Sequence, residues 1–123
     1  MNLKMVFKIS GVLGVINGIG FLFMTSMFFE MANLEMSPSA SVVGQFTGMT
    51  LLALGFITWR LAEVSGEAIG DIAKLLAILN ASWVLIIGFH VLTGQVSGPT
   101  PYINIVLVAI LATLFWVYSN KSE

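Results

Sequence analysis

The chain has 123 residues, of which 58% are hydrophobic and only 9% are charged, with a net charge of −1 and no cysteine. A water-soluble domain carries roughly 25% charged residues, so this composition excludes one, and it equally excludes a disordered chain. The near-neutral charge excludes a basic nucleic-acid-binding surface, and the lack of cysteine excludes disulfides and thiolate metal sites. We therefore expect a single integral membrane domain over residues 1–123.

Charged residues divide the chain into segments that are long enough to cross a bilayer. An ionised side chain is costly at bilayer depth, so the spans should lie between the charges. Residues 9–29, between Lys8 and Glu30, are uncharged and would form a helix of about 31 Å, the thickness of a hydrocarbon core. The same reasoning along the chain predicts four helices, near residues 6–29, 38–61, 71–93 and 101–119.

The boundaries of the later helices follow from turn-forming residues. Ser37-Pro38 combines a good N-cap with a proline at the first helical position. The long uncharged segment of residues 75–120 is divided into two spans by a run of turn formers that cannot continue a helix. This run is Thr93-Gly94-Gln95-Val96-Ser97-Gly98-Pro99-Thr100-Pro101. The predicted fold is an all-α, up-down membrane bundle of four helices.

All lysines and arginines fall on one side of this predicted bundle. They are Lys4, Lys8, Arg60, Lys74 and Lys121, and the other side has none. Because cytoplasmic loops carry the excess of Lys and Arg, both termini are predicted to be cytoplasmic. The expected location is the inner membrane of a bacterial-type cell, as a multi-pass protein.

Small residues recur at helical spacing in the first two helices. Gly14 and Gly18 are four residues apart, and so are Gly44 and Gly48. Membrane helices associate where small residues let their backbones approach closely. We interpret these glycines as packing positions inside the bundle, with a homo-oligomer seam along Gly44 and Gly48 as the alternative.

Two asparagines lie near the middle of their predicted spans. Asn17 is nine residues beyond Lys8, and Asn80 is six residues beyond Lys74. An amide in hydrocarbon needs a hydrogen-bond partner, and pairing across helices is the simplest solution. The alternative is a polar ligand site.

Three polar residues lie at a similar depth below the outer interface. They are Gln45 on the second helix, His90 on the third and Asn104 on the fourth. His90 is either simply hydrated or helps to bind a lipid or quinone-like head group, and ligation of a metal or haem is a weaker third possibility. One histidine without cysteine cannot build a metal site in a single chain, so we predict no metal and no cofactor.

Catalytic motifs are missing from the sequence. It has no Ser-His-Asp arrangement, no carboxylate pair within a span, and no HExxH or Walker-type loop. The spans also lack ionisable carboxylates and amines, which disfavours a proton-coupled or ion-coupled transporter. The sequence therefore favours a protein that is not an enzyme.

The second predicted helix contains the segment Gly44-Gln45-Phe46-Thr47-Gly48-Met49-Thr50-Leu51-Leu52-Ala53-Leu54-Gly55. It is followed by Trp59-Arg60, an acidic linker and a third helix that ends in Gly94. Together these features resemble small four-helix bacterial membrane proteins of the DoxX-like group. The resemblance implies an up-down four-helix fold and transfers no catalytic residue. Related sequences are expected to carry a basic residue early in the second helix, where this chain has Gln45 or Phe46.

Three functions remain open. The favoured hypothesis is a structural or accessory membrane protein that contacts lipids and works through helix association, as a homo-oligomer or as a subunit of a larger membrane complex. The alternative is binding or processing of a lipophilic ligand, a lipid or quinone-like molecule, in a pocket around Gln45, His90 and Asn104. The third is a passive pore in an oligomer, for which Thr47, Thr50 and Thr113 are the available polar residues.

Overall fold

The computed structural model describes residues 1–121, and most of this length is helical. The elements in order are α1 (Leu3–Phe23), α2 (Thr25–Met31), α3 (Pro38–Val64), the 3₁₀ turn η1 (Gly66–Ala68), α4 (Ile69–Leu92) and α5 (Pro99–Lys121). Four segments are long and apolar enough to cross a membrane, namely Leu3–Phe23, Pro38–Val64, Gly66–Leu92 and Pro99–Lys121. The predicted all-α class is thus confirmed, and four segments have the length and apolarity that the predicted spans require.

Helix starts follow local capping chemistry. The Ser37 hydroxyl accepts a hydrogen bond from the Ala40 N–H at 3.0 Å, and Pro38 occupies the first turn of α3, as predicted from the Ser-Pro pair. The Asn2 side-chain oxygen caps α1 in the same way, by accepting from the Met5 N–H at 3.0 Å. Helix α5 begins at Pro99, two residues before the predicted start.

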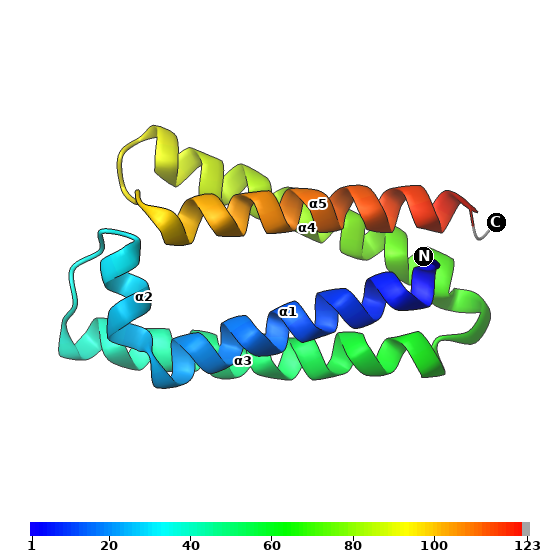
Figure 1. The fold of residues 1–123 in the computed structure, drawn as a ribbon, viewed down its shortest axis with the longest axis horizontal. Coiled ribbons are helices and arrows are strands. Elements are labelled where there is room, and N and C mark those ends of the chain that lie inside the picture. Colours follow the sequence, from blue (N-terminus) through cyan, green and yellow to red (C-terminus); the bar gives the residue numbers. More distant parts are fainter. Residues whose placement is uncertain (122–123) are drawn as a thin grey trace.

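The first predicted helix, residues 6–29, is not continuous, because the chain leaves helical geometry at Met24 (φ −127°, ψ 39°). Phe28 folds back at this break: its ring packs on Phe21, with centroids 4.9 Å apart, and covers Gly20. A side chain at Gly20 would collide with that ring. At this break α2 lies across the end of α1 instead of along its axis (Figure 1).

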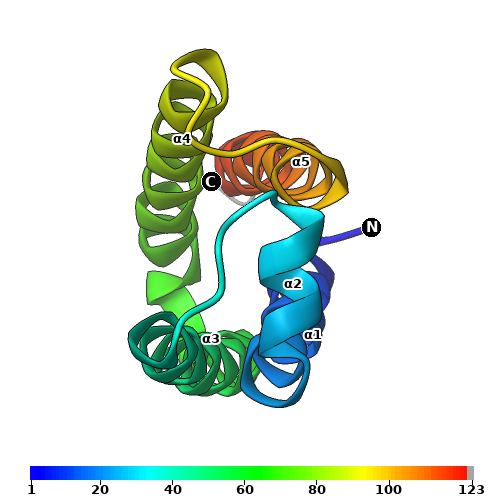
Figure 2. The same cartoon turned by 90° about the vertical axis from the view of Figure 1, so that its left-hand side faces the viewer.

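The helices pack as two pairs (Figures 1 and 2). Helix α1 contacts α3 along its length, and α4 contacts α5. Contacts between the pairs are far fewer and come mainly from α1 with α5. Both termini lie at the same end of the molecule, which we call the terminal end (Figure 1).

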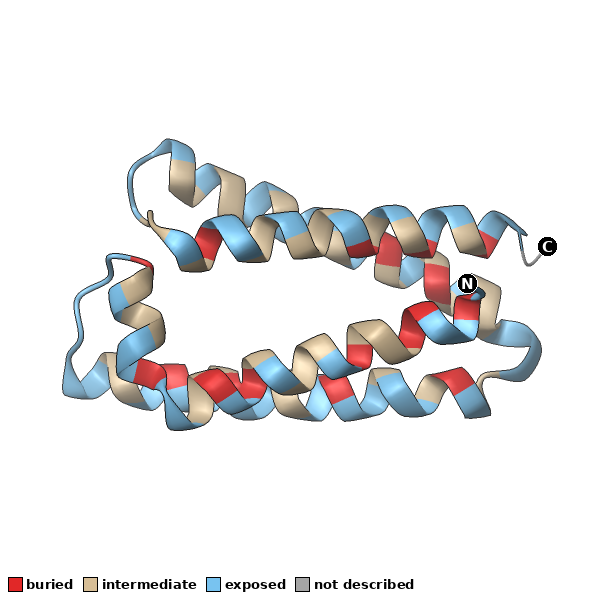
Figure 3. Ribbon diagram, viewed as in Figure 1, coloured by how far each residue is buried: buried red, intermediate tan, exposed pale blue. Residues whose placement is uncertain are grey.

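One hydrophobic cluster joins the two pairs, and it lies toward the terminal end, where α1, α4 and α5 all carry buried residues (Figure 3). Its largest members are Phe7 of α1 and Phe115 of α5, both fully buried, with their rings edge to face at 5.1 Å between centroids. The other buried members are Leu3, Val6, Ala62, Ala73, Ala77 and Leu111. This buried cluster therefore joins the helix pairs at the terminal end, while among the described residues the buried apolar residues at the other end are Ala32 and Pro101.

At the opposite end, the connection between the pairs is polar. The Asn33 amide donates to the Ser97 hydroxyl at 2.6 Å, and the Ser97 N–H donates to the Ala32 carbonyl oxygen at 3.1 Å. The Thr100 hydroxyl donates to the Phe28 carbonyl oxygen at 3.4 Å. These bonds tie α2 and the loop after it to the α4–α5 loop and the first turn of α5.

Candidate functional site

The glycines of α1 and α3 lie in the contact between these two helices. A Cβ atom at Gly18 would lie 2.5 Å from the Leu52 backbone nitrogen and 2.8 Å from the Gly48 carbonyl oxygen. A Cβ atom at Gly48 would lie 2.6 Å from the Leu22 backbone nitrogen, and one at Gly14 would lie 3.0 Å from the Gly55 Cα. Backbone thus packs directly on backbone, which is the geometry that small residues permit between membrane helices.

Gly44 is also covered by another part of the same chain, helix α2. A side chain there would collide with the Thr25 methyl group and would contact the Phe29 ring, both on α2. Gly44 and Gly48 are both buried. In this fold the two glycines are therefore covered by α1 and α2, and do not offer a free face to a second copy.

Polar side chains within the spans bond largely to their own helices. The Asn80 amide donates to the Leu76 carbonyl oxygen at 2.8 Å. The hydroxyls of Thr47, Thr50 and Thr113 each donate to the carbonyl four residues earlier, at 2.9 Å. Within residues 1–121 no hydrogen bond joins Asn17 to Asn80, so the predicted pairing across helices is not seen.

Gln45 lines an open pocket at the break between α1 and α2. The pocket has a volume of about 360 Å³, and its polar lining comes from Thr25, Ser26, Ser41 and Gln45. Its apolar lining comes from Leu22, Phe23, Met24 and Met27. This pocket, which we call the Gln45 pocket, combines neutral hydrogen-bonding groups with an apolar wall, as sites for lipophilic molecules commonly do.

His90 and Asn104 do not line the Gln45 pocket. Both are partly buried, His90 near the end of α4 and Asn104 in the second turn of α5. The His90 Nδ1 atom is buried and has no hydrogen-bond partner among the described residues. Their positions in the sequence predicted the same membrane depth as that of Gln45. The pocket that Gln45 lines is nevertheless formed by α1, α2 and α3, whereas His90 and Asn104 lie on α4 and α5.

Helix α4 is the least covered of the long helices, since only Ala73 and Ala77 are buried. An exposed stripe runs along it through Leu75, Leu79, Ser82, Ile86 and Phe89, which we call the α4 stripe. Its four apolar residues are between 46% and 58% exposed. The five positions of the stripe are separated alternately by four and three residues, the spacing of a helix–helix seam. Sequence reasoning missed this stripe, although its spacing was available as a signal.

Trp83 lies beside the α4 stripe and is 51% exposed. It is nine residues beyond Lys74, which corresponds to about 14 Å along the helix and places it near the middle of the span. Tryptophan normally concentrates at membrane interfaces, where its indole N–H finds an acceptor. An exposed tryptophan at this depth is therefore better suited to contact with protein than with lipid tails.

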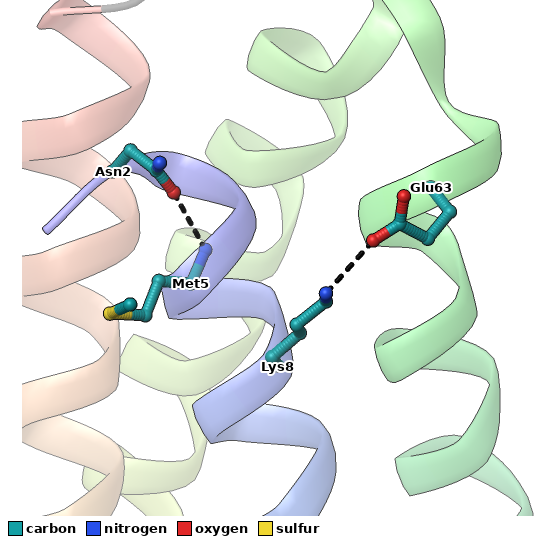
Figure 4. A network of polar contacts seen from close by, with 4 residues as sticks. All are labelled: Asn2, Met5, Lys8 and Glu63. Carbon is teal, nitrogen blue, oxygen red and sulfur yellow. Dashed lines mark hydrogen bonds and ion pairs between the residues drawn. The ribbon is translucent and has the colours of Figure 1, made fainter.

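An ion pair links α1 and α3 at the terminal end (Figure 4). The Lys8 Nζ atom lies 2.9 Å from the Glu63 Oε1 atom, and also 5.5 Å from the centroid of the Trp59 ring. Lys4 and Arg60 are close enough to interact electrostatically with the same carboxylate. The three cations outnumber the single carboxylate, so this cluster is net positive.

Within residues 1–121 no group of three His, Asp or Glu side chains could hold a metal ion. No family model, curated protein or solved structure matches this chain. The resemblance to the DoxX-like group therefore stays a prediction.

Proposed function

We propose that this chain is a small accessory membrane protein, not an enzyme, that works by associating with another transmembrane helix through the α4 stripe. The partner helix belongs to a second copy of the chain or to a subunit of a larger membrane complex. In this proposal the four spans form an up-down bundle in an inner membrane, surrounded by lipid, with both termini in the cytoplasm.

The observation that carries the proposal is the exposure of α4. Its outer part, from Ile78 to Leu92, contains no buried residue. Ser82 provides a small residue in the middle of the stripe, and its hydroxyl is already bonded to the Ile78 carbonyl oxygen at 3.0 Å, so it adds no unpaired polar group to a helix contact. Trp83 beside it supports the same conclusion, because its N–H lacks an interfacial acceptor at mid-span.

Cross-linking in membranes tests this proposal directly, because the chain has no cysteine of its own. Ser82→Cys places a thiol on the α4 stripe. Thr113→Cys is the matched control, since Thr113 is exposed on α5 and lies eight residues from Lys121, as Ser82 lies eight residues from Lys74. We expect mild oxidation to give a covalent dimer from the Ser82→Cys protein and none from the Thr113→Cys protein.

Two results would contradict the proposal. One is a Ser82→Cys protein that stays monomeric and joins no other membrane protein. The other is equal cross-linking at both positions, which indicates random collision. If the Ser82→Cys protein, labelled at its thiol with a photoreactive cross-linker that needs no cysteine on the partner, instead gives one defined product with a different protein, the association stands and the partner is another subunit.

The Gln45 pocket favours a second candidate function, binding of a lipophilic molecule that has a neutral polar head. Its amide and hydroxyl groups can hydrogen-bond to an ester, a hydroxyl or a quinone carbonyl, while Phe23 and Met27 contact the apolar part. His90 and Asn104 play no part in this version of the site.

Native mass spectrometry with lipid extraction tests the second candidate. We expect one stoichiometric adduct on the wild type and its loss in Gln45→Leu. Phe46→Leu, at the exposed neighbouring position, is the control and should keep the adduct. A wild type without any adduct, or an adduct that survives in Gln45→Leu, would remove this candidate.

A further inference from the structure

A second hollow lies on the terminal half of the α1–α3 pair. It has a volume of about 240 Å³ and is lined by Gly11, Val12, Val15, Ile16, Phe56 and Trp59, which we call the Trp59 groove. Its accessible lining is almost entirely apolar. The two helices approach closely here: a Cβ atom added at Gly11 would lie only 2.8 Å from the Gly55 carbonyl oxygen. The larger side chains on either side form the walls.

The groove lies at the depth of lipid acyl chains. Gly11 is three residues beyond Lys8 and Ile16 is eight, so the groove extends from about 5 Å to about 12 Å below the level of Lys8. Val12, Ile16 and Phe56 are 43%, 58% and 61% exposed, so nothing in the described chain covers it. It therefore opens sideways into the leaflet that contains the terminal end.

The end of the groove at Trp59 adjoins Lys8, and Lys4 and Arg60 act electrostatically on Glu63, the ion-pair partner of Lys8. Trp59 connects the groove to Lys8, because its ring is a wall of the groove and also lies 5.5 Å from the Lys8 Nζ atom. Glu63 neutralises one of the three cations through its 2.9 Å contact with Lys8. Two positive charges remain, on Lys4 and Arg60.

We propose that the Trp59 groove and this cluster form a binding site for one anionic phospholipid. An acyl chain lies along Gly11, Val15 and Phe56, and the head-group phosphate is bound by Arg60 and Lys4. The charge excess selects an anionic head group over a zwitterionic one, because each basic residue near the surface adds attraction for anionic lipid. This site is separate from the α4 stripe and from the Gln45 pocket.

The test is native mass spectrometry of the purified protein in mild detergent, titrated with phosphatidylglycerol or with phosphatidylcholine of identical acyl chains. We expect one lipid per chain, with phosphatidylglycerol preferred. Arg60→Gln should reduce that preference about fivefold, the effect of one basic residue at the surface. Lys121→Gln removes the same charge from the end of α5, a helix that does not line the groove, and should leave the preference unchanged.

A second pair of variants tests the groove itself. Val12→Trp fills the groove and should abolish binding of both lipids. Val106→Trp makes the same change at an exposed position of α5 and should not affect binding. Circular dichroism checks that all four variants keep their helix content. The proposal is overturned if the wild type binds both lipids equally, if Arg60→Gln keeps the full preference, or if Val12→Trp binds lipid as the wild type does.

Discussion

Substitution of Gly18 by alanine is the sharpest test of the α1–α3 contact. The added Cβ would lie 2.5 Å from the Leu52 nitrogen and 2.8 Å from the Gly48 carbonyl oxygen, and both are backbone atoms that no rotamer change can move. The two helices must separate, and overpacking of this kind costs about 1–3 kcal/mol. Alanine also has the higher helix propensity, which offsets up to about 1 kcal/mol of that cost.

Gly88→Ala isolates the packing effect from helix propensity. A Cβ atom there would meet only the Ile105 Cδ1 atom at 3.7 Å, an ordinary contact. Gly88→Ala therefore gains the same helix propensity as Gly18→Ala but introduces no steric clash, and it should stabilise the protein by about 0.5–1 kcal/mol. Propensity cancels in the comparison, so we expect Gly18→Ala to be about 2 kcal/mol less stable than Gly88→Ala.

The assay is reversible unfolding in mixed micelles, titrated with sodium dodecyl sulfate and followed by helical circular dichroism. Both proteins should give one cooperative transition, at a lower denaturant fraction for Gly18→Ala. If the two variants unfold together, or if Gly18→Ala is the more stable, the direct backbone contact between α1 and α3 is refuted.

Three further changes test other parts of the fold. Phe115→Ala removes the fully buried partner of Phe7 and should cost about 3–5 kcal/mol in the same assay, and a loss below that of an exposed-site alanine would contradict the terminal core. Lys8→Gln and Glu63→Gln should hardly change stability, because the pair is exposed, and any effect should vanish in high salt. Phe28→Ala should restore helical amide chemical shifts around residue 24 in NMR spectra, and unchanged shifts would exclude the ring contact as the cause of the break.

Helix positions could be predicted from the sequence because charge and capping are local properties. Ser37 and Pro38 fixed the start of α3, and the turn-forming run from Thr93 separated α4 from α5. The break at Met24 could not be predicted in this way. No proline or charge marks it, and it coincides with the Phe28 ring packing over Gly20 and Phe21, a tertiary contact.

The candidate sites were harder to predict, because depth in the membrane does not give direction around a helix. Gln45 and His90 share a depth in the sequence, yet the pocket of Gln45 is built from α1, α2 and α3. The glycine spacing indicated helix contacts, but only the coordinates give the partner of each glycine. The α4 stripe was overlooked because its apolar residues resemble ordinary lipid-facing ones until their neighbours are known.

The two ends of the molecule are held together by different forces. The terminal end is fixed by the buried Phe7 and Phe115 rings, whereas the opposite end depends on hydrogen bonds such as that from Asn33 to Ser97, for which water can compete. Amide hydrogen exchange should therefore be fastest around α2 and the α4–α5 loop. We therefore expect the two helix pairs to separate more readily at the α2 end than around the Phe7 and Phe115 rings.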